Sequence, residues 1–155
     1  MRSLTVMRFL TVPALVGLTF AATVAVPLAL AQASVLDERK AGFRSLGQSM
    51  EAIQRIVEGR QPAAGAVAPA RVIAEFAPRI KTLFPPGSDR GETRALPAIW
   101  SDRAGFDRVA DAFVPAAAAL LAAAESGDSA RLASQLQATG QACGACHRPY
   151  RAPAR

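Results

Sequence analysis

The sequence predicts an all-α fold in which four helices form an antiparallel bundle. Alanine dominates the hydrophobic residues, which make up 51% of the chain, and aromatic residues account for only 6%. This composition favours helix over sheet. Four segments carry apolar residues at steps of three and four, and short or moderate connections join them. No stretch alternates as a strand does, and 155 residues suit a single domain.

The N-terminal segment has the pattern of a secretory signal peptide. Arg2 and Arg8 make its start positive, residues 9–31 carry no charge, and small-x-small cleavage patterns end at Ala31 and Ala33. We therefore predict export, with cleavage after one of these two alanines. A retained membrane anchor is the alternative, since about 20 apolar residues can span a bilayer, although two prolines and a glycine interrupt the stretch.

Removal of residues 1–33 as signal peptide leaves residues 34–155 as the predicted bundle. The formal net charge of the whole chain is +6, and the loss of Arg2 and Arg8 lowers it by two. The remaining basic residues are scattered, with no basic block and no interleaving of basic and aromatic residues. Nucleic acid is therefore not an expected partner.

The first helix of the bundle is expected from Val35 to Glu58. Gly59 and the pair Gln61-Pro62 end it. Its apolar positions recur along one face at steps of seven, three and four, and they are Leu36, Phe43, Leu46, Met50, Ile53 and Val57.

The second helix is expected from about Pro69, because proline is tolerated in the first turn. Pro78 lies inside the helical pattern and should kink or shorten the helix. Residues 84–87 close it, and residues 88–100 are expected to be irregular because they are rich in Gly, Pro and polar residues. The apolar positions of this helix are Val72, Ile73, Phe76, Ile80 and Leu83.

The third and fourth helices are separated by the turn at residues 126–128. Ser101 or Asp102 should cap the start of the third helix, and Pro115 should bend it. The fourth helix is expected from Ser129 to about His147. The apolar face of the third helix is Phe106, Val109, Phe113, Ala117, Leu120 and Ala124. That of the fourth is Leu132, Leu136, Thr139, Cys143, Cys146 and Tyr150.

The fourth helix carries C-x-x-C-H, the pattern of covalent haem c attachment, at residues 143–147. Two thiols three residues apart on a helical turn can each reach a vinyl group of one porphyrin and form a thioether. The histidine that follows lies under the ring, where an imidazole nitrogen can bind iron. We therefore predict one haem c, attached through Cys143 and Cys146 near the C-terminus, with His147 as the iron ligand.

Other uses of a C-x-x-C pair are a redox pair, a structural disulfide and half of a zinc site. Zinc requires four ligands, whereas the chain holds two cysteines and one histidine. A thioredoxin-like pair is expected at a helix N-terminus after a strand, and this pair closes a C-terminal helix. With one histidine in the chain, a sixth iron ligand would be a methionine, a lysine or an exogenous molecule. Met50 remains after signal removal, and its position on the apolar face of the first helix favours core packing.

Three stretches of the sequence resemble cytochrome c′, a four-helix-bundle cytochrome with its haem motif near the C-terminus. The resemblance extends over residues 35–155. The stretches are Arg39 to Gly47 at the start of the first helix, Leu83-Phe84-Pro85 with Ala95 to Trp100 and Phe106-Asp107 in the middle, and Cys143 to Arg151 at the end.

The resemblance implies roles for individual residues. In the family, a first-helix residue four positions after a typical arginine lies over the open face of the iron. Here that arginine is Arg39 and the distal residue is Phe43, which cannot ligate iron, so a five-coordinate, high-spin haem is implied. Trp100 and Arg151 are also assigned to the haem site. Pro149 departs from the family pattern and should end the helix early, which would displace Arg151 from the proximal face.

The implied function is gas binding in the periplasm. An apolar distal pocket offers bound oxygen no hydrogen-bond donor, whereas nitric oxide and carbon monoxide depend much less on one. We therefore expect a protein that sequesters these gases and is not an enzyme, because a peroxidase needs a distal acid-base residue. The alternative is a low-spin electron-transfer cytochrome with a periplasmic redox partner. The resemblance further implies a homodimer through the first two helices.

Overall fold

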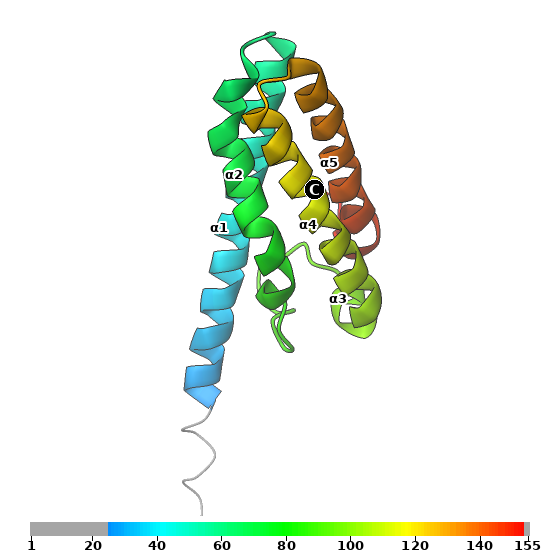
Figure 1. Cartoon of the computed structure of the whole chain (residues 1–155). Helices are drawn as coiled ribbons and strands as arrows, with labels where there is room; N and C mark the ends of the chain where they lie inside the picture. Colours follow the sequence, from blue (N-terminus) through cyan, green and yellow to red (C-terminus); the bar gives the residue numbers. More distant parts are fainter. Residues whose placement is uncertain (1–24, 154–155) are drawn as a thin grey trace, which may run out of the picture.

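The computed structural model describes residues 25–153. Its longest helices stand side by side as a bundle (Figure 1), and they are α1 (Ala25–Glu58), α2 (Val67–Phe76), α4 (Arg103–Glu125) and α5 (Ser129–Tyr150). Three short elements connect them: the 3-10 helices η1 (Ala63–Ala66) and η2 (Ala77–Leu83), and the helix α3 (Ala98–Ser101). The predicted all-α four-helix bundle is confirmed.

Helix α1 begins ten residues before the expected Val35. Its backbone therefore continues into residues 25–33 of the predicted signal segment, and residues 1–24 lie outside the described residues. Cleavage after Ala31 or Ala33 stays a prediction. Within the described part of the chain, no helix has the length and apolar character that crossing a membrane requires.

Pro78 shortens the second helix as predicted. Helix α2 ends at Phe76, and the chain continues as η2 through Pro78, because proline has no N–H to donate to the carbonyl four residues earlier. The expectation that Val72 lies on the buried face was wrong. Val72 is 40% exposed while its neighbour Ile73 is fully buried, since adjacent residues of an α-helix point in directions about 100° apart.

The segment 88–100 is more regular than expected. It contains α3, which starts after Pro97, whose backbone is already helical at φ −53° and ψ −26°, and Ile99 anchors α3 in the core at 2% exposure. The N-cap prediction for the third helix is confirmed, because the Asp102 side chain accepts a hydrogen bond from the Gly105 N–H. Helix α4 continues through Pro115 without interruption.

Helix α5 extends to Tyr150, so the early end expected at Pro149 was wrong. A proline in the last turn removes only its own N–H donor, which would have reached the Ala145 carbonyl. The Arg151 N–H still donates to the His147 carbonyl at 3.0 Å and closes the turn. Arg151 therefore stays next to His147.

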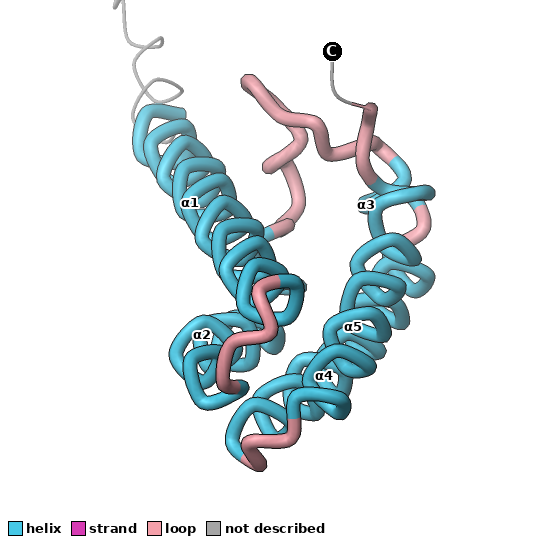
Figure 2. Tube along the Cα trace, turned by 90° about the horizontal axis from the view of Figure 1, so that it is seen from above, coloured by secondary structure: helices cyan, strands magenta, loops and turns pink. Residues whose placement is uncertain are grey.

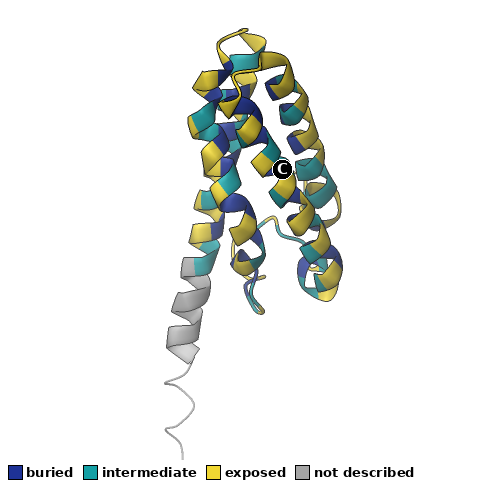
Figure 3. Cartoon of the chain, viewed as in Figure 1, coloured by how far each residue is buried: buried dark blue, intermediate teal, exposed yellow. Residues whose placement is uncertain are grey.

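The core is built from the buried faces of α1, α2, η2, α4 and α5 (Figure 3). Helix α5 packs mainly against α4 and contacts α1 only sparsely. Figure 2 shows the α1 and α5 ribbons diverging towards the end of the bundle that carries α3, where the connection before α3 passes between them. The candidate functional site lies between these diverging helices.

Candidate haem site

A cavity of about 900 Å³ lies between α1, α4, α5 and the connecting residues 91–95. Its volume falls in the range of roughly 300–1,000 Å³ that is usual for ligand and cofactor sites. Aromatic and aliphatic side chains supply much of its wall, including Phe43 and Leu46 from α1 and Phe106 and Phe113 from α4.

Both cysteines of the C-x-x-C-H motif line this cavity from α5. Their thiols are free and half-buried. Burial raises the pKa of the Cys143 thiol, and burial followed by the neighbouring Cys143 raises the pKa of Cys146 to about 11. Redox-active cysteines have lowered pKa values, so this environment does not fit the redox-pair alternative. The described residues also hold no cluster of three or more potential metal ligands, as a zinc site would require.

His147 also lines this cavity and is exposed. Partial burial lowers its pKa, and the positive charges of Arg151 and Arg94 lower it further. These effects favour the neutral imidazole, which is the form that binds metals. Arg151 places Nη1 3.4 Å from His147 Nδ1, so the structure brings this predicted site residue to the part of the cavity wall that holds His147.

Arg39 is buried at 3% exposure and ties α1 to the connection before α3. Its guanidinium donates to the Ser88 carbonyl at 2.9 Å and lies 4.6 Å from the centre of the Phe84 ring. Longer contacts reach the Leu83 carbonyl and Ser88 Oγ, each at 3.3 Å, and Thr93 Oγ1 at 3.5 Å. Arg39 therefore fixes one wall of the cavity.

Phe43 lines the cavity one turn after Arg39 on α1. Its ring packs edge-on against Phe76 at 5.5 Å and tilted against Phe84 at 6.2 Å between centroids. The structure thus brings Phe43 into the same cavity as the two cysteines of the motif. Met50, further along α1, is not among the residues that line it and packs against the core instead.

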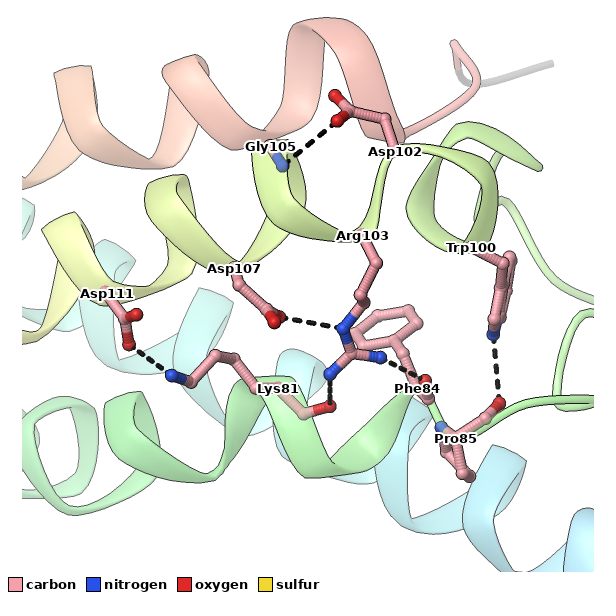
Figure 4. A network of polar contacts seen from close by, with 9 residues as sticks. All are labelled: Lys81, Phe84, Pro85, Trp100, Asp102, Arg103, Gly105, Asp107 and Asp111. Atoms are coloured by element: carbon pink, nitrogen blue, oxygen red, sulfur yellow. Dashed lines mark hydrogen bonds and ion pairs between the residues drawn. The ribbon is translucent and has the colours of Figure 1, made fainter.

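Trp100 is the one predicted site residue that the structure does not bring to the cavity wall. Its Nε1 donates to the Pro85 carbonyl at 2.9 Å (Figure 4), and its ring packs against Phe84 at 6.1 Å. Phe84 does line the cavity. Trp100 therefore lies behind Phe84, a residue of the cavity wall. Arg103 holds the same connection by donating to the Lys81 and Phe84 carbonyls.

Sequence reasoning missed a polar contact between α5 and the start of α4. Tyr150 is 6% exposed and lines the cavity, and its hydroxyl donates to Asp102 Oδ2 at 2.8 Å. The available signal was a tyrosine on an otherwise apolar face, since a buried tyrosine hydroxyl usually needs a partner. Nothing in the sequence pointed to Asp102 as that partner.

These residues fit a covalently attached haem c. The two free thiols lie on one face of α5, the histidine follows directly, and the cavity beside them is large and mostly apolar. Apolar surroundings suit a porphyrin ring, and a C-terminal helical turn presents both sulfurs to it.

Comparisons with known proteins agree with this fit. The family model described as Cytochrome C′ matches residues 34–151. Cytochrome c′ of Rubrivivax gelatinosus is 32% identical over 119 residues, which cover 75% of this chain and 92% of that protein. A variant of cytochrome c prime from Alcaligenes xylosoxidans, solved as its nitric oxide complex, is similar with a TM-score of 0.71 at 29% identity, covering 79% of this chain and 97% of that one.

A further solved cytochrome c′, described by its ligand-controlled dimer dissociation, gives a TM-score of 0.74 at 31% identity with the same coverage of 79% and 97%. The family match spans most of the chain, and the sequence relatives are matched over nearly their whole length. The chain therefore belongs to the cytochrome c′ family, whose members carry covalently attached haem c.

Proposed function

We propose that this protein binds nitric oxide and carbon monoxide at a five-coordinate haem c attached through Cys143 and Cys146, with His147 as the iron ligand. The observation that carries the proposal is the cavity itself, which has the C-x-x-C-H motif in one wall and Phe43 in another. The haem supplies an iron atom that can bind a diatomic gas. The relative solved with nitric oxide supports the choice of ligand.

Phe43 controls access to the sixth position of the iron in this proposal. Phe76 and Phe84 pack against its ring, so the ring moves aside only at a cost in packing. A phenyl ring offers no hydrogen-bond donor, which disfavours oxygen relative to nitric oxide and carbon monoxide. Phe43 thereby favours nitric oxide and carbon monoxide over oxygen, and its packed ring slows the binding of a gas ligand to the iron.

Carbon monoxide binding to the ferrous protein tests this role. If displacement of the ring costs about 1–3 kcal/mol, as overpacking does elsewhere, Phe43→Ala should raise the association rate constant by roughly 5- to 150-fold. Met50→Ala is the matched control, because Met50 lies on the same helix but outside the cavity wall, and it should leave the rate unchanged. An unchanged rate in Phe43→Ala would contradict the distal assignment.

The electron-transfer alternative needs a sixth ligand from the protein. Met50 is absent from the cavity wall, but Lys40 is present in it, so Lys40 is the candidate ligand that this alternative retains. A low-spin wild-type protein that becomes high-spin in Lys40→Ala would support it. A wild-type protein that is high-spin without added ligand would exclude Lys40 as a ligand in that state.

Export to the periplasm and a homodimer through α1 and α2 complete the proposal. The N-terminal signal pattern supports export. The exposed Val72 on α2 supports an apolar contact between the two subunits at this helix. The relative with a ligand-controlled dimer is consistent with such an assembly. N-terminal sequencing of periplasmic protein should begin at Gln32 or Ser34, and Val72→Glu should lower the dimer fraction in sedimentation.

A further inference from the structure

The end of α5 is fastened to two other parts of the chain. The Tyr150 hydroxyl donates to Asp102 Oδ2 at 2.8 Å. The Tyr150 carbonyl accepts from the Leu96 N–H at 3.0 Å, and the Ala152 N–H donates to the Arg94 carbonyl at 2.8 Å. All of these contacts lie within five residues after His147.

Asp102 serves two partners at once, and there is no room for a larger side chain at position 105 beside it. One carboxylate oxygen accepts from the Gly105 N–H at 3.1 Å (Figure 4), and the other accepts from Tyr150. A Cβ at position 105 would lie 2.0 Å from Asp102 Oδ2 and 2.5 Å from the Tyr150 hydroxyl oxygen. Only glycine therefore lets the carboxylate cap α4 and hold Tyr150 together.

His147 has little direct support of its own. Its side chain is exposed, and its Nδ1 lies 3.4 Å from Arg151 Nη1. Pro149 removes the N–H that would have bonded the Ala145 carbonyl, which weakens the turn that carries the histidine. The placement of the imidazole therefore depends on how firmly the end of this turn is held.

We infer that the Tyr150–Asp102 hydrogen bond positions His147 beneath the iron, making Tyr150 a positioning residue of the haem site. The inference rests on the proposed function for the role of His147. Tyr150 stands one turn after His147 and four residues after Cys146, so its ring lies on the cavity side of α5. The hydroxyl links that side to α4, and Phe106 packs edge-on against the ring at 5.5 Å.

Two variants of the intact holoprotein remove this hydrogen bond by different routes. Tyr150→Phe deletes the hydroxyl and keeps the ring. Asp102→Ser keeps an N-cap for α4 but is too short to reach Tyr150. Asp128→Ser is the matched control, because Asp128 caps α5 at its other end through the Ala130 and Arg131 N–H groups and has no tyrosine partner.

Two measurements report on the turn. One is the iron–histidine stretching band of the ferrous protein in resonance Raman spectra. The other is hydrogen exchange of the Arg151 amide, which bonds the His147 carbonyl. Tyr150→Phe and Asp102→Ser should each shift or broaden the band and speed exchange by about two- to tenfold, the factor that one hydrogen bond supplies. The double variant should match either single variant, and Asp128→Ser should match the wild type.

An unchanged band and unchanged exchange in Tyr150→Phe would overturn the inference, and so would an equal change in Asp128→Ser. A wild-type protein without the five-coordinate iron–histidine band would contradict the proposed function instead. In that case the Arg151 exchange rates still decide whether Tyr150 and Asp102 hold the turn.

Discussion

Replacing Arg39 with methionine should destabilise the protein far more than the same change at Arg79. The two arginines can be compared because each places its guanidinium over a phenylalanine ring. The distance to the ring centre is 4.6 Å for Arg39 and Phe84, and 5.9 Å for Arg79 and Phe76. They differ in burial. Arg39 is 3% exposed, whereas the Arg79 side chain is 57% exposed and pairs with Glu38 on the surface.

The magnitude follows from the contacts that each arginine would lose. Of the four acceptors of Arg39, the Ser88 carbonyl is close at 2.9 Å and the others lie at 3.3–3.5 Å. A hydrogen bond from a charged donor contributes about 1.5–3 kcal/mol, so one full bond and the weaker ones together give roughly 2–4 kcal/mol. Loss of the exposed Arg79 pair should cost about 0–1 kcal/mol.

Urea unfolding of the holoproteins, followed by circular dichroism and by haem absorbance, measures both costs. We expect the midpoint of Arg39→Met to fall well below that of Arg79→Met with a similar denaturant slope. Arg39→Lys should recover little, because lysine lacks the planar fork that reaches several acceptors. Equal unfolding free energies for the two methionine variants would refute the view that Arg39 fastens the connection to α1.

Three further predictions follow from the site. Cys146→Ala should leave one thioether, whereas the wild type should carry two. The denatured variant should still carry the mass of one haem, and its reduced absorption spectrum should differ from that of the wild type. Phe43→Met should give a low-spin ferrous spectrum, while Met50→Leu should not change the spin state. The pKa of Asp102 is lowered from its ordinary value of 3.8, first by the Tyr150 hydroxyl and then by the Gly105 amide. A carboxyl group with a lowered pKa stabilises the fold at pH values above its unfolded pKa, and this contribution is lost as pH falls through its folded pKa. The difference in unfolding free energy between wild type and Tyr150→Phe should therefore be constant from about pH 5 to 7 and shrink below about pH 4.

Local signals in the sequence were enough for most of the fold. Helical spacing identified the buried faces of α4 and α5, an aspartate marked the start of α4, and the two cysteines and the histidine of the C-x-x-C-H motif line one cavity from α5. These features depend on residues within a few positions of one another, which is the range over which sequence patterns act. Val72 was misplaced because two adjacent apolar residues leave the choice of the buried one to tertiary packing.

The contacts that shape the site were harder to foresee because they join distant segments. Arg39 bonds Ser88 across 49 positions, and Tyr150 bonds Asp102 across 48. No spacing rule connects such pairs. Family resemblance singled out Arg39 but not its acceptors, and it assigned Trp100 to a cavity whose wall includes its neighbour Phe84 but not Trp100 itself.

An absorption spectrum of the purified ferrous protein without added ligand shows directly whether the sixth position of the iron is free. We expect a five-coordinate, high-spin haem, because Phe43 cannot ligate iron and Met50 does not line the cavity. Addition of carbon monoxide should convert this haem to a new species. A low-spin spectrum before any ligand is added would show that a protein side chain occupies the sixth position, and the assignment of Phe43 to that face of the iron would be wrong.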